Sequence, residues 1–135
     1  MSDPASDERD PRVWLGRAES CLALAREGHG MSAVFLEDLC FQAQQAVEKV
    51  LKGLLILKSE HFPKTHDLRD LLTRVEQTGF VLPSTFRAAA DLTVYAIMTR
   101  YPGGPAVTEA DYQAALKIAT DVVAWVRREL ETAGK

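Results

Sequence analysis

The strongest indication of secondary structure in the chain is Phe41-Gln42-Ala43-Gln44-Gln45-Ala46-Val47-Glu48-Lys49-Val50-Leu51-Lys52-Gly53-Leu54-Leu55. Its apolar residues recur every three or four positions, which is the period of one face of an α-helix. These residues are Ala43, Val47, Val50, Leu51, Leu54 and Leu55. Polar side chains lie close beside this stripe, at Gln44, Gln45, Glu48, Lys49 and Lys52. We therefore expect a long helix from about Ser32 or Ala33 to Lys58 that forms the spine of the domain.

Four further helices follow from capping and stop signals on either side of this stretch. Asp10 before Pro11 is a good start, and Gly28 is a good stop. A short helix should begin near Thr65 or Asp67 and end at Gly79. A fourth should run from a Ser84 cap to the Pro102-Gly103-Gly104-Pro105 cluster, and a fifth should begin at Thr108, with Asp111 completing a capping box. The predicted fold is all-α, an up-and-down bundle of four long helices and one short helix.

Apolar positions in these helices identify the expected core. In the first helix they are Val13, Trp14, Ala18, Cys21, Leu22 and Ala25, and in the short helix Leu68, Leu71, Leu72 and Val75. In the fourth helix they are Phe86, Ala89, Ala90, Thr93, Ala96 and Ile97. In the fifth helix they are Tyr112, Ala115, Leu116, Ala119, Val122, Val123, Val126 and Leu130.

Length and composition indicate one domain without covalent staples. The chain has 135 residues, enough for a sizeable core, so we expect an acidic flexible tail over residues 1–10 and a single domain over residues 11–135. No apolar run is long enough for a membrane helix, and we expect a cytoplasmic protein. Cys21 and Cys40 are expected to be reduced, buried thiols. A net charge of −3 argues against broad nucleic-acid binding but leaves room for a local basic groove.

The polar residues of the spine helix form a row along one side. Gln44, Glu48 and Lys52 are spaced by four positions, with Gln45 and Lys49 one step round the helix. One interpretation is an exposed face with ion pairs. The other is a row that lines a groove or a dimer seam, which we favour because the glutamines abut apolar positions on both sides.

A second polar motif is Thr99-Arg100-Tyr101-Pro102-Gly103. Arg100 could hold the last carbonyls of a helix, with Tyr101 as a lid on the core. An arginine is also well suited to grip a phosphate, and an adjacent aromatic ring offers a stacking face. We favour the binding role, and both remain open.

The third motif is Lys64-Thr65-His66-Asp67-Leu68, at the start of the short helix. Capping by Thr65 or Asp67 is the simpler interpretation, and an anion site made with Lys64 and His66 is the alternative. His61, His66 and Glu60 match no familiar ligand spacing, so we expect no metal and no cofactor.

Three motifs in this order resemble the HEPN family of small helical prokaryotic domains. They are QQAVEKVLKGLLI, FPKTHDL and TRYPG, and the resemblance extends from Trp14 to about Leu130. In nuclease members of that family an Arg at the position of Arg100 is followed a few residues later by a His, and the pair cleaves RNA in a dimer. No His follows Arg100 here. The resemblance is therefore to the RYPG-bearing branch, which implies that no residue is catalytic and that the isolated chain lacks ribonuclease activity.

The resemblance implies a nucleotide- or phosphate-binding and protein-interaction module. It implies a homodimeric partner of a minimal nucleotidyltransferase, in a toxin–antitoxin pair or a two-part transferase. The expected contacts to a nucleotide or RNA are Arg100, Tyr101, Lys49, Lys52 and Glu48, followed by Lys64 and His66. The alternatives are an endoribonuclease that uses Arg100 with Glu48 or Tyr101, and a purely structural dimer.

A dimer is also expected because two helices carry apolar residues on more than one side. These are Val34, Phe35, Leu36, Leu39 and Phe41 near the start of the spine helix, and Val122, Val123, Trp125 and Val126 in the last helix.

Overall fold

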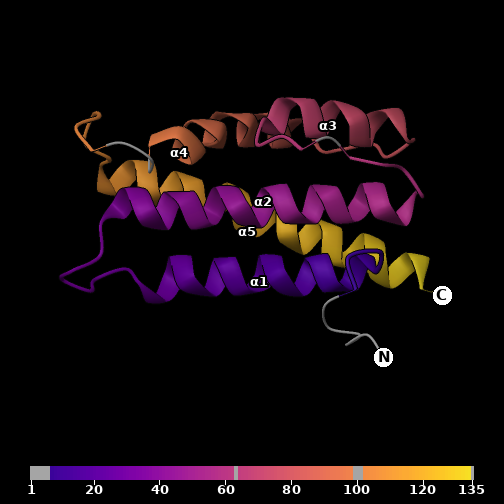
Figure 1. Cartoon of the computed structure of the whole chain (residues 1–135), viewed down its shortest axis with the longest axis horizontal. Coiled ribbons are helices and arrows are strands. Elements are labelled where there is room, and N and C mark those ends of the chain that lie inside the picture. The colour runs from indigo at the N-terminus through magenta and orange to yellow at the C-terminus, as the bar shows by residue number, and fades with distance from the viewer. Residues whose placement is uncertain (1–6, 63, 99–101, 135) are drawn as a thin grey trace.

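The computed structural model describes residues 7–62, 64–98 and 102–134, and within them every regular element is a helix. The elements are α1 (Pro11–Glu27), α2 (Leu36–Leu57), α3 (Leu68–Gln77), the 3₁₀ helix η2 (Ser84–Leu92), α4 (Thr93–Met98) and α5 (Glu109–Ala133). Figure 1 shows α1, α2 and α3 running roughly side by side, with α5 slanting behind them. The all-α prediction is therefore confirmed.

The helix ends follow the local signals in three of the helices. Asp10 caps α1, where its side chain accepts a hydrogen bond from the Arg12 N–H. Asp67 caps α3 through the Arg69 N–H, and Gly79 just beyond α3 has a φ of 110°, which favours glycine. Thr108 and Asp111 form the reciprocal capping box expected at the start of α5.

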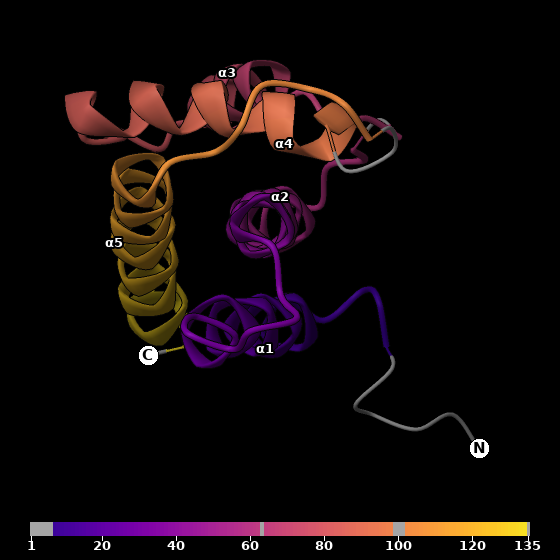
Figure 2. The same ribbon diagram turned by 90° about the vertical axis from the view of Figure 1, so that its left-hand side faces the viewer.

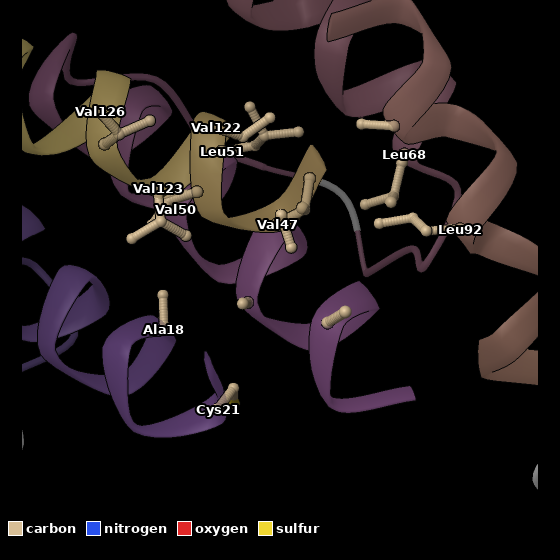
Figure 3. Packing of buried hydrophobic residues seen from close by; sticks show 14 of the residues in the cluster. Ala18, Cys21, Val47, Val50, Leu51, Leu68, Leu92, Val122, Val123 and Val126 are labelled. Carbon is tan, nitrogen blue, oxygen red and sulfur yellow. The ribbon is translucent and has the colours of Figure 1, made fainter. Parts of the chain in front are cut away.

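Helix α2 lies at the centre of the molecule. It packs against α1, α3, η2, α4 and α5, and in the view along the bundle α1 lies below it, α5 to its left, and α3 and α4 above it (Figure 2). Val47, Val50 and Leu51 of α2 meet Val122 and Val123 of α5 in the core (Figure 3), and all five are at most 1% exposed. The apolar stripe of the opening stretch is thus the centre of the core, as its period predicts.

Close packing of α1 on α2 depends on a glycine. A Cβ atom placed on Gly53 would lie 3.0 Å from the Trp14 Cβ and 3.4 Å from the Pro11 carbonyl oxygen. A larger residue at this position would push the start of α1 away from α2. Gly53 therefore sets how closely the N-terminal turn of α1, and the side chains it carries, approach α2.

The prediction of one long fourth helix is wrong in its details. The segment consists of a nine-residue 3₁₀ helix followed by the six-residue α4, and Ser84 does not cap it, because Pro83 occupies the cap position without a side-chain hydrogen bond. A 3₁₀ helix has three residues per turn, so Phe86, Ala89 and Leu92 lie on one face, and all three are buried. Ile97, expected to face inward, is 59% exposed.

The spine helix begins at Leu36, three or four positions later than expected, because two turns precede it. The Met31 N–H donates to the Gly28 carbonyl, and the Val34 N–H donates to the Met31 carbonyl.

Many of the apolar side chains that suggested a dimer are buried within the single chain. Leu39, Val122, Val123 and Val126 are core residues, and Trp125 packs edge-on against Phe80 and Phe86. Phe35, in contrast, is 67% exposed.

Three further properties concern the described part of the chain as a whole. Cys21 and Cys40 are both buried free thiols, as expected. Burial raises the pKa of the Cys40 thiol to about 11. Among the helices of the described residues, none is both long and apolar enough to cross a membrane.

Candidate functional site

A buried carboxylate organises the polar row of α2. One oxygen of Glu48 lies 2.7 Å from the His66 Nδ1 and accepts a hydrogen bond from the Gln44 amide at 3.0 Å. The other oxygen accepts one from the Lys52 Nζ, also at 3.0 Å. We call Gln44, Glu48, Lys52 and His66 the Glu48 network. It connects the middle of α2 to the segment that leads into α3.

The network is buried on its α2 side and open at His66. The Glu48 side chain is 6% exposed and that of Lys52 11%, whereas 51% of the His66 side chain is accessible to solvent. Burial raises the pKa of Glu48, but the hydrogen bonds from His66, Gln44 and Lys52 outweigh it and hold the pKa below its ordinary value. Glu48 is therefore an anion at neutral pH, with a cation on one side and an imidazole on the other.

The first interpretation of the polar row, an exposed face with ion pairs, does not hold for these residues. Gln44 and Glu48 are 0% and 5% exposed and Lys52 is 9% exposed, so the row faces the interior of a single chain. Glu48 and Lys52 do form the expected ion pair at four-residue spacing, but in a buried position. This row borders Phe62 and His66 and is largely closed by its own chain.

The pairing of His66 with Glu48 is the feature of the site that the sequence did not reveal. The absence of a His after Arg100 suggested that no imidazole would be available for acid–base chemistry. The structure places the imidazole of His66 against Glu48 from a position 18 residues further along the chain. The Gln44 amide also lies 3.5 Å from the His66 carbonyl oxygen, so side chain and backbone of His66 are both tied to α2. No pattern in the sequence marks this pairing, because it depends on how the segment after α2 folds back.

Lys49 and Lys52, expected to act together, point to different neighbours. Lys52 Nζ lies 5.3 Å from the centre of the Phe62 ring and pairs with Glu48, whose other oxygen contacts His66 before α3. Lys49 Nζ instead donates to the Cys21 Sγ of α1 at 3.3 Å. Figure 2 shows α1 and α3 on opposite sides of α2. The two lysines therefore belong to different surfaces.

The start of α3 is organised for capping. The Asp67 carboxylate accepts the Arg69 N–H at 3.1 Å, and the Thr65 hydroxyl accepts the Asp67 N–H at 3.0 Å. The N–H of Leu68, at the first position of α3, donates to the Thr93 hydroxyl at the start of α4. The backbone groups that an anion would need are thus already used by these side chains. Lys64 is exposed and lies two positions before His66.

Two of the expected contact residues, Arg100 and Tyr101, lie outside the described residues. Of the other five, the structure brings Glu48, Lys52 and His66 together and directs Lys49 elsewhere, with Lys64 nearby in sequence. Within the described ranges no group of three or more His, Cys, Asp or Glu side chains is placed to hold a metal ion.

Comparisons with known proteins place this geometry in a family. Among solved structures, TT1696 from Thermus thermophilus is 29% identical, with a TM-score of 0.74 over 87% of this chain and 96% of that one. ST0689, described as an archaeal HEPN homologue, is 26% identical, with a TM-score of 0.67 over 89% of this chain and 97% of that one. Comparison with curated proteins gave no match. The family model of the HEPN domain matches residues 11–129, nearly the whole chain. The chain therefore belongs to the HEPN domain family.

Proposed function

We propose that this protein is a nucleotide- or phosphate-binding and protein-interaction module. In this proposal it works as a homodimer and as the partner of a minimal nucleotidyltransferase, in a toxin–antitoxin pair or a two-part transferase. One observation carries the binding proposal, which is the imidazole of His66 held 2.7 Å from the buried Glu48 carboxylate. A cation or donor that is oriented in advance binds a phosphate at less entropic cost than a free side chain.

The arrangement of His66 supports a role in gripping an anion. With Nδ1 against Glu48, the other ring nitrogen, Nε2, has no hydrogen-bond partner in the described part of the chain. The contact with Glu48 fixes the orientation of the ring, and an imidazole that binds a phosphate through Nε2 carries a proton on that nitrogen. Lys64 is exposed two positions away and supplies a positive charge. Arg100 and Tyr101 follow α4 in sequence and keep their proposed roles as phosphate grip and stacking face.

Lys52 contributes to this proposal indirectly. Its ammonium is already neutralised by Glu48 at 3.0 Å, so it holds the carboxylate in place rather than offering charge to a ligand. Glu48 likewise positions His66. The direct contacts in the proposed site are His66, Lys64, Arg100 and Tyr101.

The proposal of protein partners is supported by apolar side chains left exposed on the described surface. Phe35 and Met31 before α2 are 67% and 59% exposed, and Val94 and Ile97 on α4 are 47% and 59% exposed. Exposed large apolar side chains in neighbouring segments are a common mark of contact surfaces. Sedimentation equilibrium at micromolar concentration tests the homodimer, and a clean monomer would contradict it.

Calorimetric titration tests the binding proposal. ATP, GTP, CTP and UTP are titrated into the wild type, Arg100→Ala and His66→Asn, alone and, if a neighbouring reading frame encodes a nucleotidyltransferase, together with that protein. Loss of one hydrogen bond to a charged group costs about 1.5–3 kcal/mol, so each variant should bind more than about tenfold more weakly. His29→Asn is the matched control, because His29 also lies 2.7 Å from a glutamate, Glu109, outside the Glu48 network. No heat in any combination, or equal affinity in all proteins, would leave a structural dimer.

A second candidate function, an endoribonuclease with a non-standard site, is favoured by the same imidazole–carboxylate pair. A histidine oriented by a carboxylate is the commonest acid–base group in proton transfer, and RNA transesterification needs such a group. Labelled single-stranded RNAs test this function. Cleavage by the wild type and His29→Asn but not by His66→Asn or Arg100→Ala would support it. The leading proposal expects no cleavage by any of them.

A further inference from the structure

We propose a second ligand site, between α1 and α2, that binds a small organic anion carrying a planar ring. It is a cavity of about 270 Å³ lined by Glu8, Val13, Trp14, Arg17 and Lys49. Lys49 reaches it from the side of α2 that packs on α1, whereas the Glu48 network lies toward α3. This site is thus separate from the one proposed above.

The ammonium group of Lys49 has no counter-ion among the described residues. Lys49 is half-buried, and its Nζ donates to the Cys21 Sγ at 3.3 Å. A thiol is a weak acceptor and carries no charge to balance the lysine. No Asp or Glu carboxylate of the described residues lies within ion-pair distance of Lys49. A cation partly withdrawn from water is costly unless an anion accompanies it, so the cavity beside Lys49 is suited to an anionic group.

Arg17 places a second cation at the same cavity. Arg17 lies one helical turn after Trp14 on α1, is exposed, and forms no ion pair with the residues that the structure describes. Its planar guanidinium group donates in pairs to carboxylates and phosphates. Lys49 and Arg17 together exceed the single carboxylate of Glu8, so the cavity keeps an excess of positive charge.

The indole ring of Trp14, which lines the cavity, is held in place by contacts within the chain. The indole N–H of Trp14 donates to the Glu8 carbonyl at 2.7 Å, and the Phe62 ring packs edge-on against the indole at a centroid distance of 5.3 Å. A held indole offers a flat face for stacking at little entropic cost. The cavity therefore pairs a stacking surface with an anion grip.

Size and charge narrow the ligand class. A volume of 270 Å³ is near the lower limit of small-molecule sites, about 300 Å³, which suits one ring with one acidic group rather than a polymer. The Glu8 carboxylate opposes highly charged ligands such as triphosphates. Phosphate and carboxylate satisfy the same two cations, so a nucleoside monophosphate and an aromatic carboxylate share the required chemistry.

Tryptophan fluorescence tests the site directly. The chain has two tryptophans, so Trp125→Phe leaves Trp14 as the reporter inside the cavity. We expect AMP, benzoate or both to change its emission in a saturable way, and adenosine and inorganic phosphate to act at least about tenfold more weakly. A response to AMP alone assigns a phosphate ligand, and a response to benzoate alone assigns a carboxylate. Ligand-observed saturation-transfer NMR on the wild type provides the same comparison without a substitution in the core.

Variants separate this site from the Glu48 network. Lys49→Met and Arg17→Ala should each weaken binding by about tenfold or more. Arg12→Ala is the matched control, because Arg12 is on the same helix but pairs with Asp10, and His66→Asn should also leave binding unchanged. If no ring-bearing anion binds by either method, or if binding is the same in Lys49→Met and Arg17→Ala as in the wild type, the proposal is overturned.

Discussion

Two histidine–glutamate pairs in this molecule have the same contact distance, through Nδ1 in His66 and Nε2 in His29, but opposite surroundings. His66 lies 2.7 Å from Glu48, and His29 lies 2.7 Å from Glu109, but the Glu48 side chain is 6% exposed and the Glu109 side chain 58%. His29 also stacks on the Tyr112 ring at 4.6 Å, which ties the end of α1 to the start of α5. Water screens the outer pair, whereas the inner one is embedded among partners that depend on it.

The comparison teaches that burial, and not distance, decides what a charged hydrogen bond does. The pKa of each carboxyl is lowered, but for different reasons. For Glu109 the hydrogen bond from His29 is the largest cause. For Glu48 the largest influence is burial, which raises the pKa, and three donors overcome it. The inner carboxylate is therefore charged because these donors offset its burial, and the same contacts hold His66 in one orientation.

The largest expected effect is on stability when Glu48 is removed. Glu48→Ala leaves the Lys52 ammonium, which is 11% exposed, without its counter-ion, and removes a partner of Gln44 and His66. Breaking a buried pair in this way should lower the free energy of unfolding by about 3–5 kcal/mol. Urea denaturation measures this change. Glu109→Ala is the control and should unfold like the wild type, and equal effects of the two substitutions would break the comparison.

A double variant sharpens the same point. If the damage in Glu48→Ala comes from the unpaired Lys52, then replacing both residues by methionine should recover about 2 kcal/mol or more relative to Glu48→Ala. The double variant keeps apolar volume and removes the buried charge altogether. Urea unfolding of the double variant and of Glu48→Met and Lys52→Met alone closes the cycle. Stabilities that are simply additive would show that the two side chains do not depend on each other.

The pH dependence of stability should distinguish the buried carboxylate next. The pKa of Glu48 in the folded protein is below its ordinary value of 4.5, so its contribution is fully present above that value. The contribution is lost as the pH falls through the lowered folded-state pKa. The melting temperature, measured from pH 7 into acid, should therefore fall more steeply with decreasing pH in the wild type than in Glu48→Gln. The difference should be seen below the ordinary pKa of a glutamate. Curves of the same shape in both proteins would contradict the assignment.

The smallest effect is expected at His66 itself. Its side chain is 51% exposed, so loss of the hydrogen bond to Glu48 in His66→Asn should cost only about 1 kcal/mol after allowance for solvent. The small cost makes this variant suitable for binding assays, because it stays folded. Chemical denaturation checks it, and a loss as large as that of Glu48→Ala would mean that His66 is mainly a structural residue.

Sequence reasoning succeeded where the signals are local. The caps at Asp10 and Thr108 and the stripe of α3 depend on residues within a few positions of each other, and all three are confirmed. The central helix could be predicted because its apolar residues recur at a regular helical period over several turns. The 3₁₀ segment was missed, although Phe86, Ala89 and Leu92 recur at intervals of three, the period of that helix.

The candidate site was less accessible to sequence reasoning. Positions along α2 placed Glu48 and Lys52 together correctly, but the direction in which Lys49 points depends on the packing of α1. The pairing of Glu48 with His66 joins residues 18 positions apart in the chain, which no local pattern specifies. At the start of α3 the sequence left both Thr65 and Asp67 as possible caps, and the structure shows that the Asp67 carboxylate accepts the Arg69 N–H.

Side-chain NMR of the three histidines tests the central claim most directly. The chain contains only His29, His61 and His66, so each imidazole can be assigned by substitution and followed as a nucleoside triphosphate is added. The account predicts that the Nε2 signal of His66 moves in a saturable way, while those of His29 and His61 stay in place. An unchanged His66 signal at saturating nucleotide, or equal movement of all three, would contradict a binding site at the Glu48 network.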